Sequence, residues 1–155
     1  MITRELIESI RDRLRKSIAN MAVELFPEKP DEYRLNHPNG AILVSYRSSK
    51  FEETNDITYV VQPRRVVFTV SVLRRQLNGN TGILDVLDAV RLALTGFKGP
   101  NCRRKFYVLQ EIYLGETAGI WQYSIDFATE MMQVEEAEEI KLPVLTVVNY
   151  EESND

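Results

Sequence analysis

The side chains that could do chemistry are few in this chain and lie far apart in the sequence. His37 is the only histidine and Cys102 is the only cysteine among the 155 residues. One histidine excludes a zinc site built from histidines, and a serine–histidine pair would have to be built around His37. His37 stands in the turn-forming sequence Asn-His-Pro-Asn-Gly. We therefore expect His37 to be an ordinary loop residue.

Cys102 and the paired carboxylates are the remaining candidates for catalysis. Arg103 and Arg104 follow Cys102, and neighbouring guanidinium groups can lower a thiol pKa. No partner base is identifiable, so we expect a structural cysteine. Asp85 and Asp88 fall on the solvent side of a predicted helix, where paired carboxylates are common. The sequence thus predicts no catalytic residue, no metal ligand and no cofactor, and a hydrolase built only from carboxylates stays open as an alternative.

The most distinctive charges are basic clusters at the ends of predicted strands. Arg64-Arg65 opens one predicted strand and Arg74-Arg75 closes it. A strand rises about 3.3 Å per residue, so the two pairs lie about 30 Å apart and cannot form one patch on a subunit. Such charges can protect strand edges from pairing, or they can set partner choice and register at an interface. Arg103-Arg104-Lys105 opens the next predicted strand, over 106–114. If the two strands are parallel neighbours, this cluster lies beside Arg64-Arg65. If they are antiparallel, it lies beside Arg74-Arg75. The residues predicted to form a subunit or partner interface are Arg64, Arg65, Arg74, Arg75, Arg103, Arg104 and Lys105.

The net charge of −4 is unevenly distributed. From Glu130 onward the chain has eight acidic residues and one lysine, a net charge of −7, which leaves +3 on the rest. A mildly positive body with an acidic tail argues against tight, sequence-independent DNA binding. No apolar run approaches the roughly 18 residues that span a bilayer, and charges occupy the positions where a signal peptide is apolar. With one cysteine and no possible internal disulfide, we expect a cytoplasmic protein with no membrane partner.

Hydrophobic periodicity predicts an α+β fold with the order α-βββ-α-ββ. Apolar residues recur every three or four positions from Ile2 to Leu25, which predicts a helix that Pro27 ends. Pro63 predicts a turn between two strands, Thr81 is the expected N-cap of the second helix, and Gly96 fits its C′ position. The expected elements are a helix over 2–26, a loop over 27–40, strands over 41–46, 57–61 and 66–73 with a loop over 48–56, a helix over 81–95, and strands over 106–114 and 121–127.

The last predicted hairpin has the clearest alternation in the chain. Four apolar residues, Trp121, Tyr123, Ile125 and Phe127, alternate with Gln122, Ser124 and Asp126. One wet and one dry face are typical of an antiparallel sheet that is covered on one side. We therefore predict a mostly antiparallel sheet of about five strands with two helices on one face. Residues 1–135 are expected to form this domain, and 136–155 to form an acidic C-terminal extension that could add a strand at 144–148.

The order and character of these elements resemble a known family. The segments that carry the resemblance are GAILVSY, VVFTVSVLRRQL, GILDVLDAVRLALTGFKG and YVLQEIYLGETAGIWQYSIDFATEM. Together they resemble the minor tail proteins of Mu-like phages and prophages, a family that is similar to the tail terminator proteins of long-tailed phages. The resemblance covers about residues 1–135 and includes no catalytic signature.

The resemblance implies a structural protein and no enzyme. It implies a small α+β subunit that assembles with itself into a ring, typically a hexamer, at the end of the tail tube. Its further partners would be the tail tube protein and the head–tail connector proteins, and DNA would pass through the ring without specific binding. Such a protein would be found in the host cytoplasm or in the virion. The alternatives are another virion assembly or adaptor protein, or a small enzyme of unrecognised type.

Overall fold

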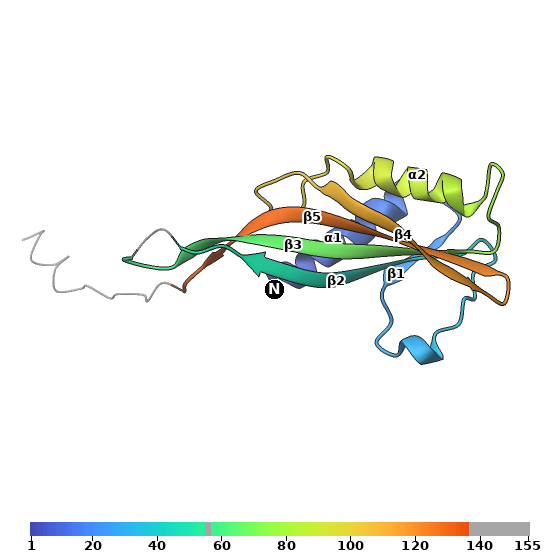
Figure 1. Cartoon of the computed structure of the whole chain (residues 1–155), viewed down its shortest axis with the longest axis horizontal. Coiled ribbons are helices and arrows are strands. Elements are labelled where there is room, and N and C mark those ends of the chain that lie inside the picture. Colours follow the sequence, from blue (N-terminus) through green and yellow to red (C-terminus); the bar gives the residue numbers. More distant parts are fainter. Residues whose placement is uncertain (55–56, 137–155) are drawn as a thin grey trace, which may run out of the picture.

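The computed structural model describes residues 1–54 and 57–136 (Figure 1). These residues form an α+β fold, as the sequence predicts, with two α-helices and five strands in the order α-βββ-α-ββ. The elements are α1 (Ile2–Ser17), β1 (Ala22–Leu25), the 3-10 helix η1 (Pro30–Glu32), β2 (Ala41–Phe51), β3 (Val61–Arg74), α2 (Ile83–Leu94), β4 (Tyr107–Thr117) and β5 (Ile120–Val134).

The strands form one sheet in the order β1-β2-β3-β5-β4. The β1–β2 pair is parallel and the other three pairs are antiparallel. The long strands β2, β3 and β5 extend past the helices as an arm, which Figure 1 shows on the left. None of the helices among the described residues is long and apolar enough to cross a membrane.

Both helices pack on the same face of the sheet, as predicted, and the core lies between them and the strands. Phe68 of β3 is at its centre, with ring centroids 5.0 Å from Phe106 and 5.4 Å from Phe127. Alternation along β3 and β5 directs every second side chain to this helix-covered face. No described element covers the opposite face, which we call the open face. The helix residues of the core are Leu6, Ile7, Ile10 and Leu14 of α1 and Ile83, Val86, Leu87, Val90, Ala93 and Leu94 of α2.

The first helix is shorter than predicted. It ends at Ser17, not at residue 26, and the chain then turns through Asn20, whose φ of 65° is left-handed. Ala22–Leu25 form β1 beside β2. Ile18 and Met21 pack against the core from the turn, so their apolar spacing mimics a continued helix although no helix is present.

The turn predicted at Pro63 is also wrong, because β3 is continuous from Val61 to Arg74. The carbonyl oxygen of Pro63 accepts a hydrogen bond from the Glu52 N–H at 3.1 Å. The missing N–H of Pro63 faces this same side, just past the last residue of β2, where the Glu52 carbonyl oxygen instead accepts a hydrogen bond from the Gln62 side-chain amide at 2.8 Å. A proline can therefore lie within the central strand. The strand predicted over 57–61 is absent from residues 57–60, and β2 runs on to Phe51 into the predicted loop.

The N-cap of the second helix lies one residue later than predicted, and the C′ residue is the predicted one. Gly82 is the N-cap, while the Thr81 hydroxyl lies 2.7 Å from the Gln76 side-chain oxygen. Thr95 is the C-cap and Gly96 follows at C′ with a φ of 84°. The left-handed conformation is one that glycine adopts at little cost. The predicted C-terminal extension lies outside the described residues, apart from Glu136.

Candidate functional site

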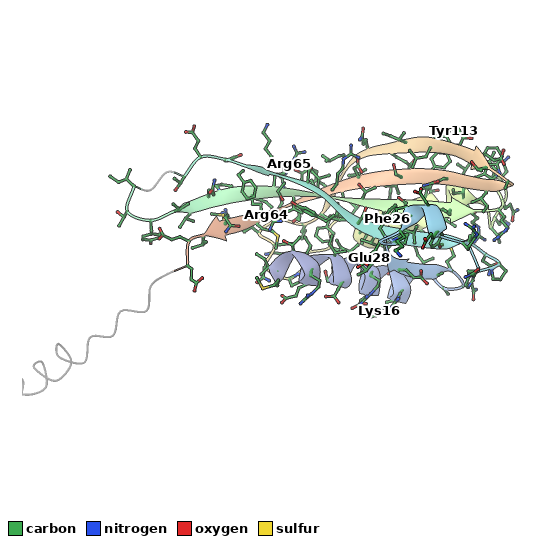
Figure 2. The ribbon with its side chains drawn as sticks, turned by 90° about the horizontal axis from the view of Figure 1, so that it is seen from below. Lys16, Phe26, Glu28, Arg64, Arg65 and Tyr113 are labelled. Atoms are coloured by element: carbon green, nitrogen blue, oxygen red, sulfur yellow. The ribbon has the colours of Figure 1, made fainter. Side chains whose placement is uncertain are left out.

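The structure separates Arg64 and Arg65, which are neighbours in sequence, onto opposite faces of the sheet. Figure 2 shows Arg64 between the sheet and α1, and Arg65 on the open face. Only 7% of Arg64 is exposed to solvent, whereas Arg65 is exposed. Alternation along β3 causes the separation, so this pair cannot act as one surface patch.

Arg64 ties the start of α1 to the strands. Its Nε donates to the Ser49 hydroxyl at 2.9 Å, and its Nη2 donates to the Thr3 hydroxyl at 3.1 Å. Its guanidinium carbon lies 5.8 Å from the ring centroid of Tyr46 and 6.0 Å from that of Phe51. Burial acts to raise the pKa of Tyr46, but the Ser49 hydrogen bond and the Arg64 charge outweigh it and lower that pKa. Arg64 is thus part of the framework of the domain.

Arg65 belongs to a row of charges that crosses the open face. It is opposite Lys50 of β2 on one side and Glu130 of β5 on the other. Beyond β5, the Arg103 N–H donates to the Glu130 carbonyl oxygen at 2.7 Å, and the Arg103 guanidinium lies 3.3 Å from the Glu130 carboxylate. β3 and β4 run in the same direction with β5 between them, so the predicted third cluster lies at the same end of the sheet as Arg65.

Four basic residues gather at this end of the open face, and we call them the basic end: Lys50, Arg65, Arg103 and Arg104. Arg104 lies over the ring of Tyr107, with its guanidinium carbon 4.6 Å from the centroid. Glu130 is the carboxylate within this row. Lys105, the last residue of the predicted cluster, is exposed beside it. The structure therefore brings four of the seven predicted interface residues to one end: Arg65, Arg103, Arg104 and Lys105.

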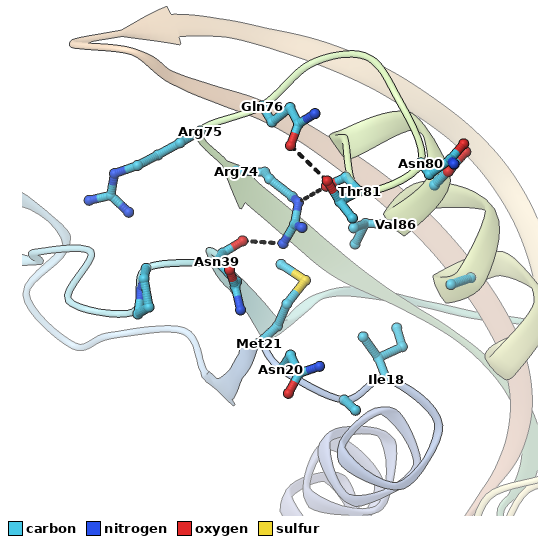
Figure 3. A pocket seen from close by; sticks show the side chains of 14 residues that line it. Ile18, Asn20, Met21, Asn39, Arg74, Arg75, Gln76, Asn80, Thr81 and Val86 are labelled. Atoms are coloured by element: carbon cyan, nitrogen blue, oxygen red, sulfur yellow. Dashed lines mark hydrogen bonds between the residues drawn. The ribbon is translucent and has the colours of Figure 1, made fainter.

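Arg74 and Arg75, at the other end of β3, hold loops together. Arg74 donates to the carbonyl oxygens of Asn39 and Thr81, and Figure 3 shows both contacts. Arg75 donates to the carbonyl oxygens of His37 at 3.0 Å and Leu35 at 3.2 Å. The two guanidinium groups thus fix the 35–39 loop and the turn before α2 against the end of the sheet.

These arginines line an open pocket of about 490 Å³ between the α1–β1 turn and α2 (Figure 3). Asp85 is the only carboxylate among the described residues that line it. Nucleophilic or general acid–base chemistry needs converging titratable groups, and the pocket brings none together. His37 is in the adjoining loop, where its Nδ1 accepts a hydrogen bond from the Asn39 N–H at 3.1 Å. It is a turn residue, as the sequence predicts.

Cys102 has the properties of a structural thiol. It is buried against the core, and burial raises its pKa in spite of a hydrogen bond with Thr129 and the charge of Lys98. A raised pKa leaves less of the nucleophilic thiolate at neutral pH. Asp85 and Asp88 are exposed on α2, as predicted, and Asp88 contacts Arg91 of the same helix. Within residues 1–54 and 57–136, no group of three or more metal-ligating side chains forms.

Sequence reasoning missed a buried polar cluster around Asp126 on the open face. The alternation places Asp126 on a wet face, but only 3% of it is exposed. Its carboxylate accepts hydrogen bonds from Arg47 at 3.0 Å, Thr69 at 2.7 Å and Gln110 at 2.7 Å. These partners come from β2, β3 and β4, so the cluster ties four strands together. The sequence gives no clear signal of this burial, because Asp126 alternates with apolar residues in the same way as Gln122 and Ser124.

The described residues thus form a sheet with one helix-covered face, one open face with charged side chains, and a pocket in which no catalytic set converges. The chain belongs to the family described as Gp37 protein, whose match covers residues 10–152. That match includes residues 137–152, beyond the part that carries the resemblance given above.

The fold recurs in a solved structure of a virion. A chain of the virion of a native gene transfer agent particle is 15% identical to this one, with a TM-score of 0.57. The alignment covers 85% of this chain and 98% of that chain. The likeness shows a shared fold. No curated protein matches the sequence.

Proposed function

We propose that this chain is a structural protein of a phage-type particle, and specifically a tail terminator that forms a hexameric ring on the end of the tail tube and joins it to the head. The observation that carries the proposal is the structural alignment with a chain of a gene transfer agent virion, which covers 98% of that chain. Membership of the Gp37 protein family supports it. As part of a virion, the chain would bind the tail tube and connector proteins.

The sheet supports a ring because its two outer edges differ. β1 and the end of β2 form one edge, and β4 forms the other. Head-to-tail contacts between unlike surfaces close into rings when the rotation allows it. A subunit with unlike edges on opposite sides offers two such surfaces.

The basic end offers an electrostatic contact for this assembly. Lys50 and Arg65 lie side by side and are exposed, and charges at an interface set orientation and partner choice. We propose that the basic end faces an acidic surface of a neighbouring subunit or of the tail tube. Arg64 is excluded from this role by its burial, and Arg74 and Arg75 would act indirectly by holding their loops.

The test is the mass of the purified protein by light scattering after size exclusion, with negative-stain images before and after tail tubes are added. We expect rings of about six subunits, or caps on tube ends if rings need the tube. The absence of both rings and caps in the wild-type protein would contradict the terminator proposal.

A double charge reversal tests the basic end separately. Lys50→Glu with Arg65→Glu should weaken ring or cap formation while the far-UV spectrum and melting temperature stay nearly unchanged. Lys16→Glu is the matched control, because Lys16 is an exposed cation on α1, away from the open face (Figure 2). Normal assembly of the double variant would refute the interface and leave the terminator proposal standing.

A further inference from the structure

The outer edge of β2 is paired along only part of its length. β1 pairs with Ala41–Val44, and the last bond runs from the Phe26 N–H to the Val44 carbonyl oxygen at 2.8 Å. From Tyr46 to Phe51, no described strand lies on this side of β2 (Figure 1). An open strand edge is a template for another strand.

The hydrogen-bonding pattern identifies which backbone groups this edge offers. The Glu52 N–H donates toward β3, to the Pro63 carbonyl oxygen. Backbone groups of successive strand residues point to alternate sides. The groups of Ser48 and Lys50 therefore face β3, and those of Ser49 and Phe51 face outward.

Apolar surface accompanies the open edge. Tyr46 is 43% exposed and Phe51 is 48% exposed. An open groove of about 370 Å³ adjoins Tyr46 where β1 ends, and its apolar lining includes Ile7, Leu25 and Phe26. Backbone groups that need partners and apolar side chains that need cover thus lie together, which is the combination that an added strand satisfies.

We propose that residues 144–149 of this chain pair with β2 along Tyr46–Phe51 as a sixth strand of the sheet. The segment reads Val-Leu-Thr-Val-Val-Asn, which is rich in the β-branched residues that favour strands. It has six residues, as does the open edge. Pro143 precedes it, in a position where a strand tolerates proline.

Direction and reach favour this occupant. β5 and β2 are both antiparallel to β3, so they run the same way and the chain leaves β5 near the far end of β2. A segment that turns back runs antiparallel to β2. Glu135 is fixed beside Val60 by a 2.9 Å hydrogen bond. From there the new strand begins about 14 Å across and about 13 Å along the sheet, and nine residues span up to about 30 Å.

Charge complements this placement. The segment before the proposed strand has Glu138 and Glu139, which would pass the exposed Lys50. Glu151 and Glu152 follow the strand and would end near Arg4, which lines the groove. The inference concerns a single chain and does not depend on the ring.

Amide hydrogen exchange of the full chain, resolved by residue with NMR, tests the proposal. Ser48 and Lys50 are internal references because β3 already pairs with them. We expect Ser49 and Phe51 to be protected as well. The full-length variant Val147→Pro should speed exchange at Ser49 and Phe51 at least tenfold and leave the references unchanged.

Ser153→Pro is the matched control, since it places a proline in the same terminus beyond the proposed strand, and it should change none of these rates. Unprotected Ser49 and Phe51 in the wild-type chain would overturn the proposal, and so would protection that survives Val147→Pro. Protection that increases with protein concentration would assign the edge to a second copy and would also overturn it.

Discussion

Replacement of Arg64 by alanine should destabilise the domain far more than the same change at Arg65. Arg64→Ala removes charged hydrogen bonds to Ser49 and Thr3 and the contacts over Tyr46 and Phe51. Each such hydrogen bond contributes about 1.5–3 kcal/mol. The half-buried hydroxyls can regain water, and the variant no longer buries a cation, so we expect a net loss of about 2–3 kcal/mol.

Urea unfolding with a linear extrapolation measures this loss. Arg65→Ala is the control, because Arg65 is exposed on the open face, and its change should stay within about 0.5 kcal/mol. Arg64→Lys should lose about 1 kcal/mol, since an ammonium is a point charge without the planar fork of Arg. The melting temperature of Arg64→Ala should fall by about 4–12 °C, given roughly 2–4 °C per kcal/mol at this size.

The tyrosine beside Arg64 gives an independent readout. The Arg64 charge contributes to the lowered pKa of Tyr46, so Arg64→Ala should raise that pKa, as measured by NMR titration of the Tyr46 ring. Equal stability of the two alanine variants, together with an unchanged Tyr46 pKa, would refute the assignment of Arg64 to the framework.

Three further outcomes follow from the described contacts. Asp126→Asn should lower the free energy of unfolding by about 2–3 kcal/mol in urea, because the buried carboxylate loses its charge pairing with Arg47; an unchanged stability would contradict its role in tying the strands. Gly40→Ala should lower the free energy of unfolding by more than about 3 kcal/mol, since a Cβ there would lie 2.2 Å from a carbonyl oxygen of β3. Gly96→Ala should lower it by about 1 kcal/mol, because nothing lies within 4 Å of that Cβ and only the left-handed φ is strained. Similar losses for the two variants in urea unfolding would show that the predicted clash is absent. Burial raises the pKa of Cys102 above its usual 9.0, so the unfolded chain loses the thiol proton first and stability should fall as pH rises past about 9, a trend that Cys102→Ala should lack in urea unfolding over pH 7–10.

Local signals in the sequence predicted much of the fold. The Gly96 stop, the apolar stripe of α2 and the core-facing residues of β5 each depend on a few neighbouring residues, and all three are confirmed. The exposed polar face predicted for β5 is wrong, because Ser124 and Asp126 are buried. The end of α1 was mispredicted because Ile18 and Met21 keep helical spacing while they pack from a turn. The strand β1 has only four residues, which are too few for the alternation of a strand to be recognised beside the helical spacing that precedes it.

Features that depend on sheet order could not be predicted. Whether Pro63 fits a central strand depends on where the neighbouring strand ends. The burial of Asp126 depends on partners up to 79 residues away in the sequence. The position of Arg103 beside Glu130 likewise requires β5 to lie between β3 and β4. The sequence identified the basic residues. Which of them stabilise the domain, as Arg64 does, and which are exposed, as Arg65 is, could be seen only from the pairing of the strands.

The alternation of β3 between a covered and an open face has a consequence for how this protein can evolve. Along β3, every second residue from Arg64 to Val72 is buried on the covered face, while Arg65, Val67 and Thr69 between them are exposed or only partly buried. Mutations can therefore accumulate on the open face and change which surfaces bind to each other, while the packing that makes the subunit fold is kept. Two lineages could in this way come to bind different partners while every intermediate sequence still folds. A shared fold at 15% identity is what such divided selection would leave behind.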